Sequence, residues 1–196
     1  YENEGHMALD RVASLNLELT ESVRGHQRKG SLLWLLDRTV TSMGSRMLKT
    51  WIEQPLIDRD AIENRLGAVQ RFKTDLMPAE ALKGALSEVY DIERLLSKIA
   101  YDTVNARDCL ALNASLRAVP EIKQILSSMP EQLIAEIEQM LDPLDALSDL
   151  LTRAISEDAP LTVKEGGMIR TGYHEELDKL RSASIDGKTW IASLEQ

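Results

Sequence analysis

The sequence predicts a mainly α-helical fold: an irregular multi-helix core domain with a small β element near its start, a short hairpin near residues 161–170 and a long projecting helix at its end. Three observations predict this class. Apolar residues recur at the helical period along most of the chain. Aromatic residues make up only 4%, which is low for a sheet protein. Prolines and acidic residues stand where helices begin. With 43% apolar residues, the 196-residue chain can bury a real core.

The start of the chain mixes strand and helix signals. Residues 7–10 fit a short strand that leads into a helical turn, and residues 15–20 alternate apolar and polar side chains, which predicts a strand. Residues 25–30 are expected to form a loop. Ser31 can cap residues 32–36, and because this run is apolar all round we expect a fully buried short helix.

A strong helical stripe follows Thr41, which has the side chain of an N-cap. Pro55 ends this helix because proline disfavours helical geometry at the residue before it. Trp51 belongs to the stripe, so we expect it to be buried and its replacement with alanine to cost about 3–5 kcal/mol of unfolding free energy. The stripe consists of Met43, Met47, Leu48, Trp51 and Ile52.

The middle of the chain repeats this helical pattern without a fixed period, so we predict no solenoid. Asp58 or Asp60 can cap the second helix, and Asp60 with Glu63 has the spacing of a capping box. Short connections predict that neighbouring helices pack antiparallel or at an angle. Three later prolines stand where helices can begin, since the first helical position needs no N–H: Pro120, Pro130 and Pro143.

The last part of the chain predicts a hairpin and then a long helix. Residues 161–163 and 168–170 flank two glycines, which is typical of a small hairpin. We therefore divide the chain into a helical core domain, 1–172, and the start of a projecting helix, 173–196. The helical pattern reaches the last residue without a cap, and the chain starts without Met, so we expect a fragment. The sparse apolar positions of the helix are Leu177, Leu180, Ile185, Trp190, Ile191 and Leu194.

Charge is distributed unevenly. The net charge is −9, of which residues 1–98 carry −1 and residues 99–196 carry −8. Residues 24–49 carry six Lys or Arg against a single Asp, a local net charge of +5. Such a stretch is most often a solvated surface, and its functional alternative is contact with phosphate or an acidic partner. The acidic second half opposes DNA binding. The candidate weak phosphate contacts are Arg24, Arg28 and Lys29.

Residue spacing assigns no catalytic, metal or cofactor site. Cys109, the single cysteine, lies on an apolar helical stripe and is expected in the core rather than as a nucleophile. A zinc site needs about four ligands. The histidines lack ligand partners at helical or loop spacing, and they are His6, His26 and His174.

Several whole-protein classes are excluded. One cysteine cannot form an internal disulfide and suits a reducing compartment. No run of about 18 apolar residues could span a membrane, and the polar, acidic start is no signal peptide. We therefore expect a cytoplasmic protein. Residues 187–189, Gly-Lys-Thr, resemble the end of a phosphate-binding loop, but Ser182 stands where that loop needs its first glycine, and the segment fits a helix.

A series of motifs runs through the chain in a specific order. LDRTVTSMGSRML at 36–48 is the longest, and the others occupy 17–19, 29–33, 51–56, 62–66, 91–95, 167–173 and 176–178. Together they resemble the core domain of the MutS family of DNA mismatch-recognition proteins, in the form that bacteria use. The resemblance runs from about Met7 to Gln196 and is loosest near 120–150.

The resemblance implies a role and a set of partners. In that family the core carries helical levers that join a clamp around DNA to an ATPase. The chain is thus expected to be a structural lever segment that takes part in mismatch repair only within the full-length protein. By itself it is expected to be no enzyme and to hold no cofactor, since ATP and Mg would bind elsewhere in the parent. The partners implied for the parent are mismatched duplex DNA, a second MutS subunit and downstream repair factors, with no membrane.

Two alternatives remain open from the residues alone. In one, the chain is a free-standing helical protein-interaction module that uses residues 24–49 and the last helix. In the other it is a free-standing DNA binder, which the net charge argues against. Under the lever hypothesis the distal stripe from Ile185 onward lacks its partner helix, while Leu177 and Leu180 stay near the body. We then expect fraying or self-association through 173–196.

Overall fold

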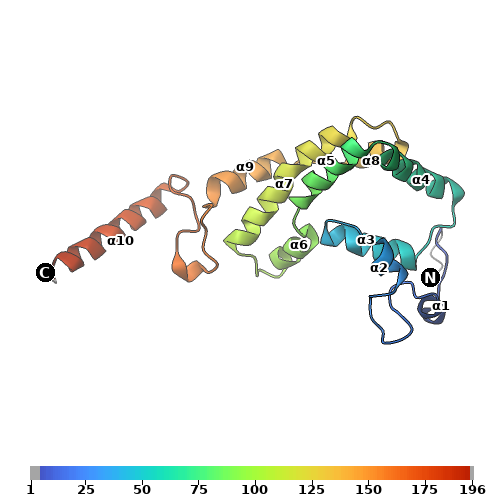
Figure 1. Cartoon of the computed structure of the whole chain (residues 1–196). Coiled ribbons are helices and arrows are strands. Elements are labelled where there is room, and N and C mark those ends of the chain that lie inside the picture. Colours follow the sequence, from blue (N-terminus) through green and yellow to red (C-terminus); the bar gives the residue numbers. More distant parts are fainter. Residues whose placement is uncertain (1–4, 195–196) are drawn as a thin grey trace.

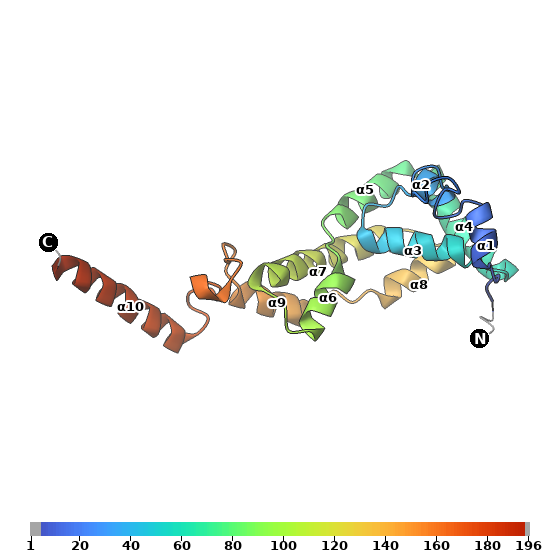
Figure 2. The same ribbon diagram turned by 90° about the horizontal axis from the view of Figure 1, so that it is seen from below.

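The structure is a computed structural model that describes the backbone of residues 5–194 and the side chains of residues 5–184. It is mainly α-helical, as the sequence predicts, and it is elongated. A small N-terminal module lies at one end, packed helices form a body in the middle, and α10 (Glu175–Leu194) projects from the other end (Figure 1, Figure 2). No helix in this described part is long and apolar enough to cross a membrane.

The N-terminal module, residues 5–57, has a small core of its own. Its helices are α1 (Arg11–Asn16), α2 (Leu32–Leu36) and α3 (Ser42–Glu53). Leu19 and Leu33 are buried, and the N–H of Leu33 donates to the carbonyl of Leu19 at 2.9 Å. Ser31 is 2% exposed and caps α2, as predicted, by accepting a hydrogen bond from the N–H of Trp34. This segment therefore folds around its own buried residues.

The small β element predicted near the start is wrong. Asp10 accepts a hydrogen bond from the N–H of Ala13 at 2.6 Å, and this cap begins a helix that enters the stretch predicted as a strand. Within residues 5–57 the extended pairing is limited to an isolated bridge between His6 and Leu56. The alternating pattern of residues 15–20 has no neighbouring strand to pair with, so the local capping interaction decides the conformation.

Two apolar side chains expected in the core are exposed instead. In α2 Leu33 is buried, but Leu35 is 58% exposed, because the thin module covers one face of this short helix. Trp51 of α3 is 40% exposed, and the guanidinium carbon of Arg65 lies 3.8 Å from its ring centroid. The expected burial of Trp51 is therefore wrong, and its replacement with alanine would remove a solvent-facing cation–π contact rather than a core side chain. Thr41 caps α3 as predicted, through the N–H of Gly44.

The body is organised around one long central helix, α7. The helices of the body are α4 (Arg59–Thr74), α5 (Leu76–Ser87), α6 (Ile92–Ala100), α7 (Ala106–Leu126), α8 (Gln132–Met140) and α9 (Asp145–Ala154). Helices α5, α6, α8 and α9 all pack against α7. One apolar cluster joins α7 to α5 and α8 around Ile122 and Ile134, and a second joins it to α6 and α9 around Leu95 and Leu116.

Pro120 lies inside α7 and does not begin a helix. A proline inside a helix removes one backbone hydrogen bond and destabilises the helix by about 3 kcal/mol or more, which is why the sequence favours a helix start at this residue. Here Leu116, Val119 and Ile122 are all buried on one side of the helix. Burying this continuous face stabilises the unbroken helix and outweighs the local cost. Asp58, the first of the two suggested caps, starts α4 by accepting from the N–H of Ala61 at 2.8 Å.

Polar side chains fix how the helices of the body face each other. Asn113 of α7 is 7% exposed and donates to the Thr152 hydroxyl of α9 at 2.9 Å, while it accepts from Ser148 at 2.8 Å. Ser115 is fully buried and accepts from the N–H of Tyr90, which precedes α6. A buried polar group that keeps its partners defines one register between helices, since sliding would leave it unsatisfied.

The hairpin predicted near 161–170 is also wrong. Residues Val163–Glu165 form a 3-10 turn, in which Thr162 and Glu165 cap each other. The extended pairing is a single bridge between Ile155 and Ile169, so the chain folds back against the end of α9 rather than on itself. The two glycines do adopt positive φ, at Gly166 and Gly167, but they serve a wider loop.

The projecting helix is present where the sequence predicts it, two residues later than expected. Leu177 is half-buried, whereas Leu180 is 68% exposed, so only the first of the two side chains expected near the body lies there. The side chains of Ile185, Trp190, Ile191 and Leu194 lie outside the described residues, and self-association through this helix stays a prediction.

The Ile134 side chain offers a direct test of the core. We expect Ile134→Ala to lower the free energy of unfolding by about 2–5 kcal/mol, because Ile134 is 2% exposed and truncation leaves a cavity. Met140→Ala, on the same helix at 76% exposure, is the matched control and should change it by less than about 0.5 kcal/mol. Urea denaturation followed by circular dichroism measures both, and equal effects would contradict the assignment of this cluster as core.

Candidate functional site

The root of α10 is a compact, hydrogen-bonded joint. We call residues 155–172, which link α9 to α10, the collar. The bridge between Ile155 and Ile169 closes this loop, and the N–H of Arg170 donates to the carbonyl of Ala154 at 2.8 Å. Both ends of the collar are therefore held together at the end of α9, and α10 leaves from a fixed point (Figure 1).

The collar is also tied to the central helix. Arg107, in the first turns of α7, donates through Nε to the carbonyl of Ala159 at 3.1 Å. Ala159 is 2% exposed, so the middle of the collar packs against the body rather than extending into solvent. Arg170 adds an ion pair with Glu157 at 3.1 Å within the collar.

The first turns of α10 are hydrogen-bonded to the collar. Arg181 donates through Nη2 to the carbonyl of Ile169 at 2.9 Å and through Nη1 to Asp178 at 3.3 Å. Asp178 also accepts from the N–H of Gly172 at 2.7 Å. Gly172 has φ +87°, which an L side chain rarely adopts, so glycine permits the turn into the helix. A continuous set of contacts thus connects α7, the collar and α10.

The candidate phosphate contacts lie in an exposed loop of the N-terminal module. The structure brings Arg24, Arg28 and Lys29 onto the loop between α1 and α2, and all three residues are exposed. Arg28 is engaged in an ion pair with Asp37. Within residues 5–184, Arg24 and Lys29 have no ion pair of their own, so they carry the positive charge that this loop presents. Whether they contact phosphate stays a prediction.

Asp37 organises the turn between α2 and α3. It accepts hydrogen bonds from the hydroxyls of Ser45 and Thr39, both at 2.6 Å, and from the N–H of Thr39 at 3.1 Å, besides its pair with Arg28. Donation by Ser45 and Thr39 holds the pKa of the Asp37 carboxyl well below its usual range, with Arg28 adding to the effect. The one acidic residue of the basic stretch is thus the one that fixes its shape.

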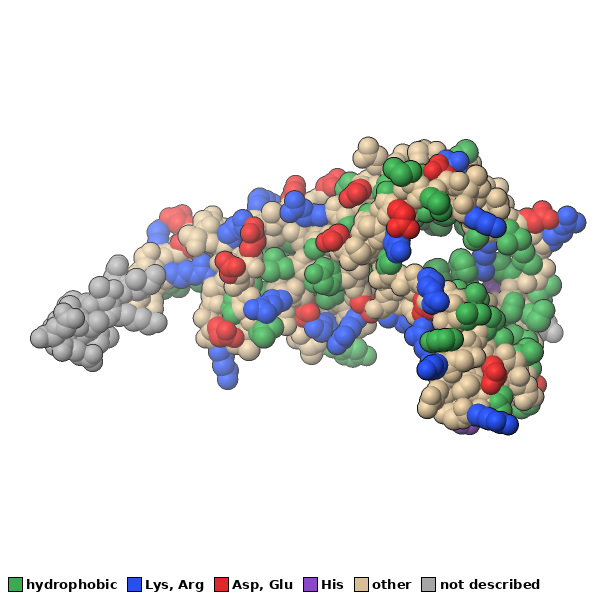
Figure 3. Space-filling model, in the orientation of Figure 1, with side chains coloured by type: hydrophobic (Ala, Val, Ile, Leu, Met, Phe, Trp, Pro, Cys, Tyr) green, Lys and Arg blue, Asp and Glu red, His purple; other side chains and the backbone are tan. Residues whose placement is uncertain are grey.

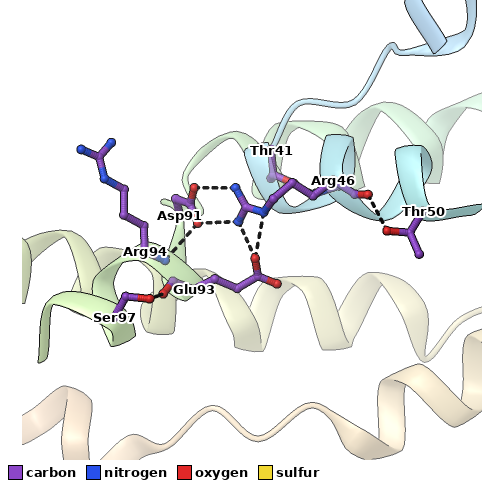
Figure 4. A network of polar contacts seen from close by, with 8 residues as sticks. Thr41, Arg46, Thr50, Asp91, Glu93, Arg94 and Ser97 are labelled. Atoms are coloured by element: carbon purple, nitrogen blue, oxygen red, sulfur yellow. Dashed lines mark hydrogen bonds and ion pairs between the residues drawn. The ribbon is translucent and has the colours of Figure 1, made fainter. Parts of the chain in front are cut away.

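Arg46 of α3 reaches across to the beginning of α6, as Figure 4 shows. Its guanidinium donates to both carboxylate oxygens of Asp91, at 2.9 and 2.7 Å, and to Glu93 through two nitrogens at 2.9 and 2.6 Å. Asp91 also accepts from the N–H of Arg94, which caps α6. Arg46 holds the pKa of Asp91 below its usual value. Another member of the basic stretch is therefore engaged by carboxylates.

The described side chains give no metal or nucleophile arrangement. No group of three or more His, Cys, Asp or Glu residues among them could hold a metal ion. Cys109 is half-buried on α7 and not fully in the core. Burial raises the pKa of its thiol, whereas reactive cysteines have a lowered pKa. Residues 187–189, Gly-Lys-Thr, lie within α10, where the backbone is helical and no phosphate-binding loop is formed.

Comparison with known proteins identifies the family. The family model for MutS domain III matches residues 13–196, almost the whole chain. The chain belongs to the MutS family. The resemblance given by the motifs is thereby confirmed, including its extent along the chain.

Bacterial MutS proteins match along the whole chain. The DNA mismatch repair protein MutS of Geobacillus thermodenitrificans is 51% identical over 195 residues, which cover 100% of this chain and 21% of the relative. The proteins of the same name from Brevibacillus brevis and Bacillus cytotoxicus are 48% and 49% identical and cover 100% of the chain. The chain spans about a fifth of the length of these curated relatives.

Several residues that build this MutS domain were not singled out from the sequence as sites. Arg181 and Asp178 lie three residues apart on a helix, a common spacing for surface ion pairs that carries no special signal. Arg46 belongs to the basic stretch and to the motif at 36–48, and its partners belong to the motif at 91–95, but the sequence does not show that these two motifs meet, since the partners lie 45 and 47 residues further along. Asp91 stands directly before the apolar stripe of α6, a position typical of a capping carboxylate, and this signal could have marked it as structurally placed.

The hydrogen bonds of Asp37 predict a pH dependence. A carboxyl whose pKa is lowered by folding stabilises the folded state above its unfolded pKa, about 3.9, and this contribution is lost as the pH falls below that value. We expect Asp37→Asn to lower the unfolding free energy by about 1–2 kcal/mol at pH 7 and by much less at pH 3. Denaturant titrations at the two pH values measure this. Asp149→Asn, an exposed carboxylate on α9, is the control, and a loss of equal size at both pH values would contradict the assignment.

Proposed function

We propose that this chain is the core segment of a DNA mismatch repair protein and that it transmits rotation between a DNA clamp and an ATPase. The observation that carries the proposal is the root of α10: a long helix leaves the body from a joint held by Arg181, Asp178 and the collar. A helix so anchored moves as a rigid extension of α7, because helices are stiff and the joint is closed by hydrogen bonds at several points.

The division of the chain follows the same proposal. Residues 1–172 are the core domain and residues 173–196 are the start of the lever that leads towards the clamp. The chain by itself is no enzyme under this proposal, and the ATP and Mg of the parent would bind in another domain. The relatives carry the name DNA mismatch repair protein, which supports mismatch repair as the process the parent serves. A cytoplasmic location accords with such a role.

The partners belong to the parent protein. They are mismatched duplex DNA, a second MutS subunit and downstream repair factors. The contribution of this segment to DNA binding is local: the loop that carries Arg24 and Lys29 supplies weak contacts to phosphate, with Arg28 held by Asp37. The exposed Leu180 supports association through 173–196 when this segment is separated from the rest of the protein.

Breaking the lever tests the proposal in the whole protein that carries this segment. Ser182→Pro places a proline inside α10, one residue beyond Arg181, where it removes a backbone hydrogen bond and kinks the helix. We expect basal ATP hydrolysis to continue while the difference in hydrolysis rate between mismatched and fully paired duplex disappears. The measurement is the steady-state ATPase rate with each duplex.

The matched control is Ser182→Ala, which keeps the helix continuous and should preserve the response to mismatched DNA. If the Ser182→Pro protein still distinguishes the two duplexes as the original does, α10 does not transmit the signal and the lever proposal fails.

The basic loop gives a second test, on the isolated chain. We expect weak, salt-sensitive binding to duplex DNA without preference for a mismatch, because phosphate contacts carry no sequence information. Arg24→Ala with Lys29→Ala should lower the slope of log K against log salt by about 2, since each phosphate contact contributes about 0.9. Fluorescence anisotropy measures this, with Lys83→Ala and Lys164→Ala as the control pair. A preference of the isolated chain for mismatched duplex would refute the assignment.

A further inference from the structure

The N-terminal module and the body do not share an apolar core. The buried residues of the module are Leu19, Ser31 and Leu33, which lie on its own loop and on α2. Neither of the two apolar clusters of the body includes a residue from 5–57. All described side chains of α3, the helix of the module that runs beside the body, are at least partly exposed. Burial of apolar surface, the main force that fixes one unit on another, is therefore weak at this boundary.

A hollow separates the two units. It has a volume of about 280 Å³ and lies between the turn that precedes α3 and the helices α4 and α5. Val40 faces it from the module, and Phe72, Leu82 and Leu86 face it from the body. Figure 3 shows the opening on the surface, with apolar side chains on both of its sides. Close packing across the boundary is absent at this point, so the module has room to move.

Arg46 supplies every hydrogen bond between the two units within residues 5–184. Its guanidinium binds Asp91 with two nitrogens and Glu93 with two, and the three side chains are 48%, 22% and 66% exposed (Figure 4). A cation–π contact also crosses the boundary, where the guanidinium carbon of Arg65 lies 3.8 Å from the ring centroid of Trp51. Because these charges face solvent, salt screens their attraction far more than it weakens a buried contact.

The carboxylates that hold Arg46 are themselves rigidly placed. Asp91 caps α6 through the N–H of Arg94, and Leu95 of α6 packs on Leu112 and Leu116 of α7. The contact at Arg46 therefore joins the module to α6 and, through Leu95, to α7. Loss of the Arg46 contact would release α3 without disturbing the packing of α6 on α7.

We propose that residues 5–57 form a module that swings on the helical body about the chain link between Ile57, which is hydrogen-bonded within the module, and Asp58, which caps α4, and that Arg46 with Asp91 and Glu93 is the clasp that holds it closed. The contact between Arg46 and the two carboxylates is reversible. It opens where salt or a competing charged group replaces the carboxylate–guanidinium contact, and it leaves both small cores intact. This inference is independent of the lever proposal, since it concerns the opposite end of the molecule.

The position of the module can be measured by distances between spin labels. Leu35→Cys on α2 and Arg117→Cys on α7 are both exposed, and Cys109→Ala removes the native thiol. With the clasp intact we expect one narrow distance distribution at low salt. In about 1 M NaCl, where the Debye length is about 3 Å, we expect this distribution to broaden towards longer distances.

Two variants open the clasp directly. Arg46→Gln removes the cation, and Glu93→Gln removes one carboxylate while leaving the capping residue Asp91 in place. Arg46→Gln should lose the narrow distribution even at low salt, and salt should then have little further effect. Glu93→Gln keeps the pair with Asp91, so its distribution should broaden at a lower salt concentration than that of the original chain. Lys49→Gln is the control, because Lys49 lies on the same helix and pairs only with Glu53 of that helix within the described residues. It should behave like the original chain.

Hydrogen exchange separates swinging from unfolding. If the module swings as a unit, the amide of Leu33, which donates to Leu19, stays protected in Arg46→Gln. Loss of that protection would mean that the module unfolds instead, and this result would overturn the proposal. An unchanged narrow distribution in Arg46→Gln at both salt concentrations would also overturn it, because contacts other than the clasp would then hold the module.

Discussion

The burial of α7 is the constraint on which the rest of the structure depends. Nine of its residues are buried, and four other helices pack against it from different sides. This burial explains why the helix continues through Pro120 and why polar groups such as Asn113 and Ser115 lie on it with all their partners in place. Burial of the apolar faces of α7 stabilises the helix by more than the loss of one backbone hydrogen bond at Pro120 costs. Helices α5, α6, α8 and α9 are positioned by their contacts with this helix, and α4 packs in turn on α5 and α8.

Outside the apolar core, arginine side chains make the hydrogen bonds that join neighbouring elements. Arg46 joins the N-terminal module to α6, Arg107 joins the collar to α7, and Arg181 joins α10 to the collar. A guanidinium suits this task because it offers several N–H donors in a plane and can bind two acceptors at once. Such contacts orient elements without burying them. The middle of the molecule is thus held by apolar packing, and the elements at both ends are joined to it by hydrogen bonds of arginine side chains, exposed at Arg46 and part-buried at Arg107 and Arg181.

The charge pattern has a structural origin as well as a functional one. Residues 24–49 looked like a basic surface, yet Arg28 and Arg46 bind carboxylates and Lys49 pairs with Glu53. Asp37, the single acid of the stretch, receives hydrogen bonds from three neighbouring residues. The positive charge presented to solvent is thus smaller than the sequence count of +5, and among the described residues it is carried by Arg24 and Lys29 on one loop and by Arg38 between α2 and α3.

The sequence by itself determined the family, the helical class, the caps at Ser31, Thr41 and Asp58 and the projecting helix. The helical class, the caps and the projecting helix rest on periodicity and capping chemistry that act over a few residues, whereas the family rests on the order of motifs along the whole chain. Tertiary structure decided the rest. It buried Leu33 but left Trp51 exposed, and it kept α7 continuous at Pro120. It also brought Arg46 to Asp91 from 45 residues away, because burial and ion pairing depend on which surfaces meet, and spacing along one chain cannot specify that.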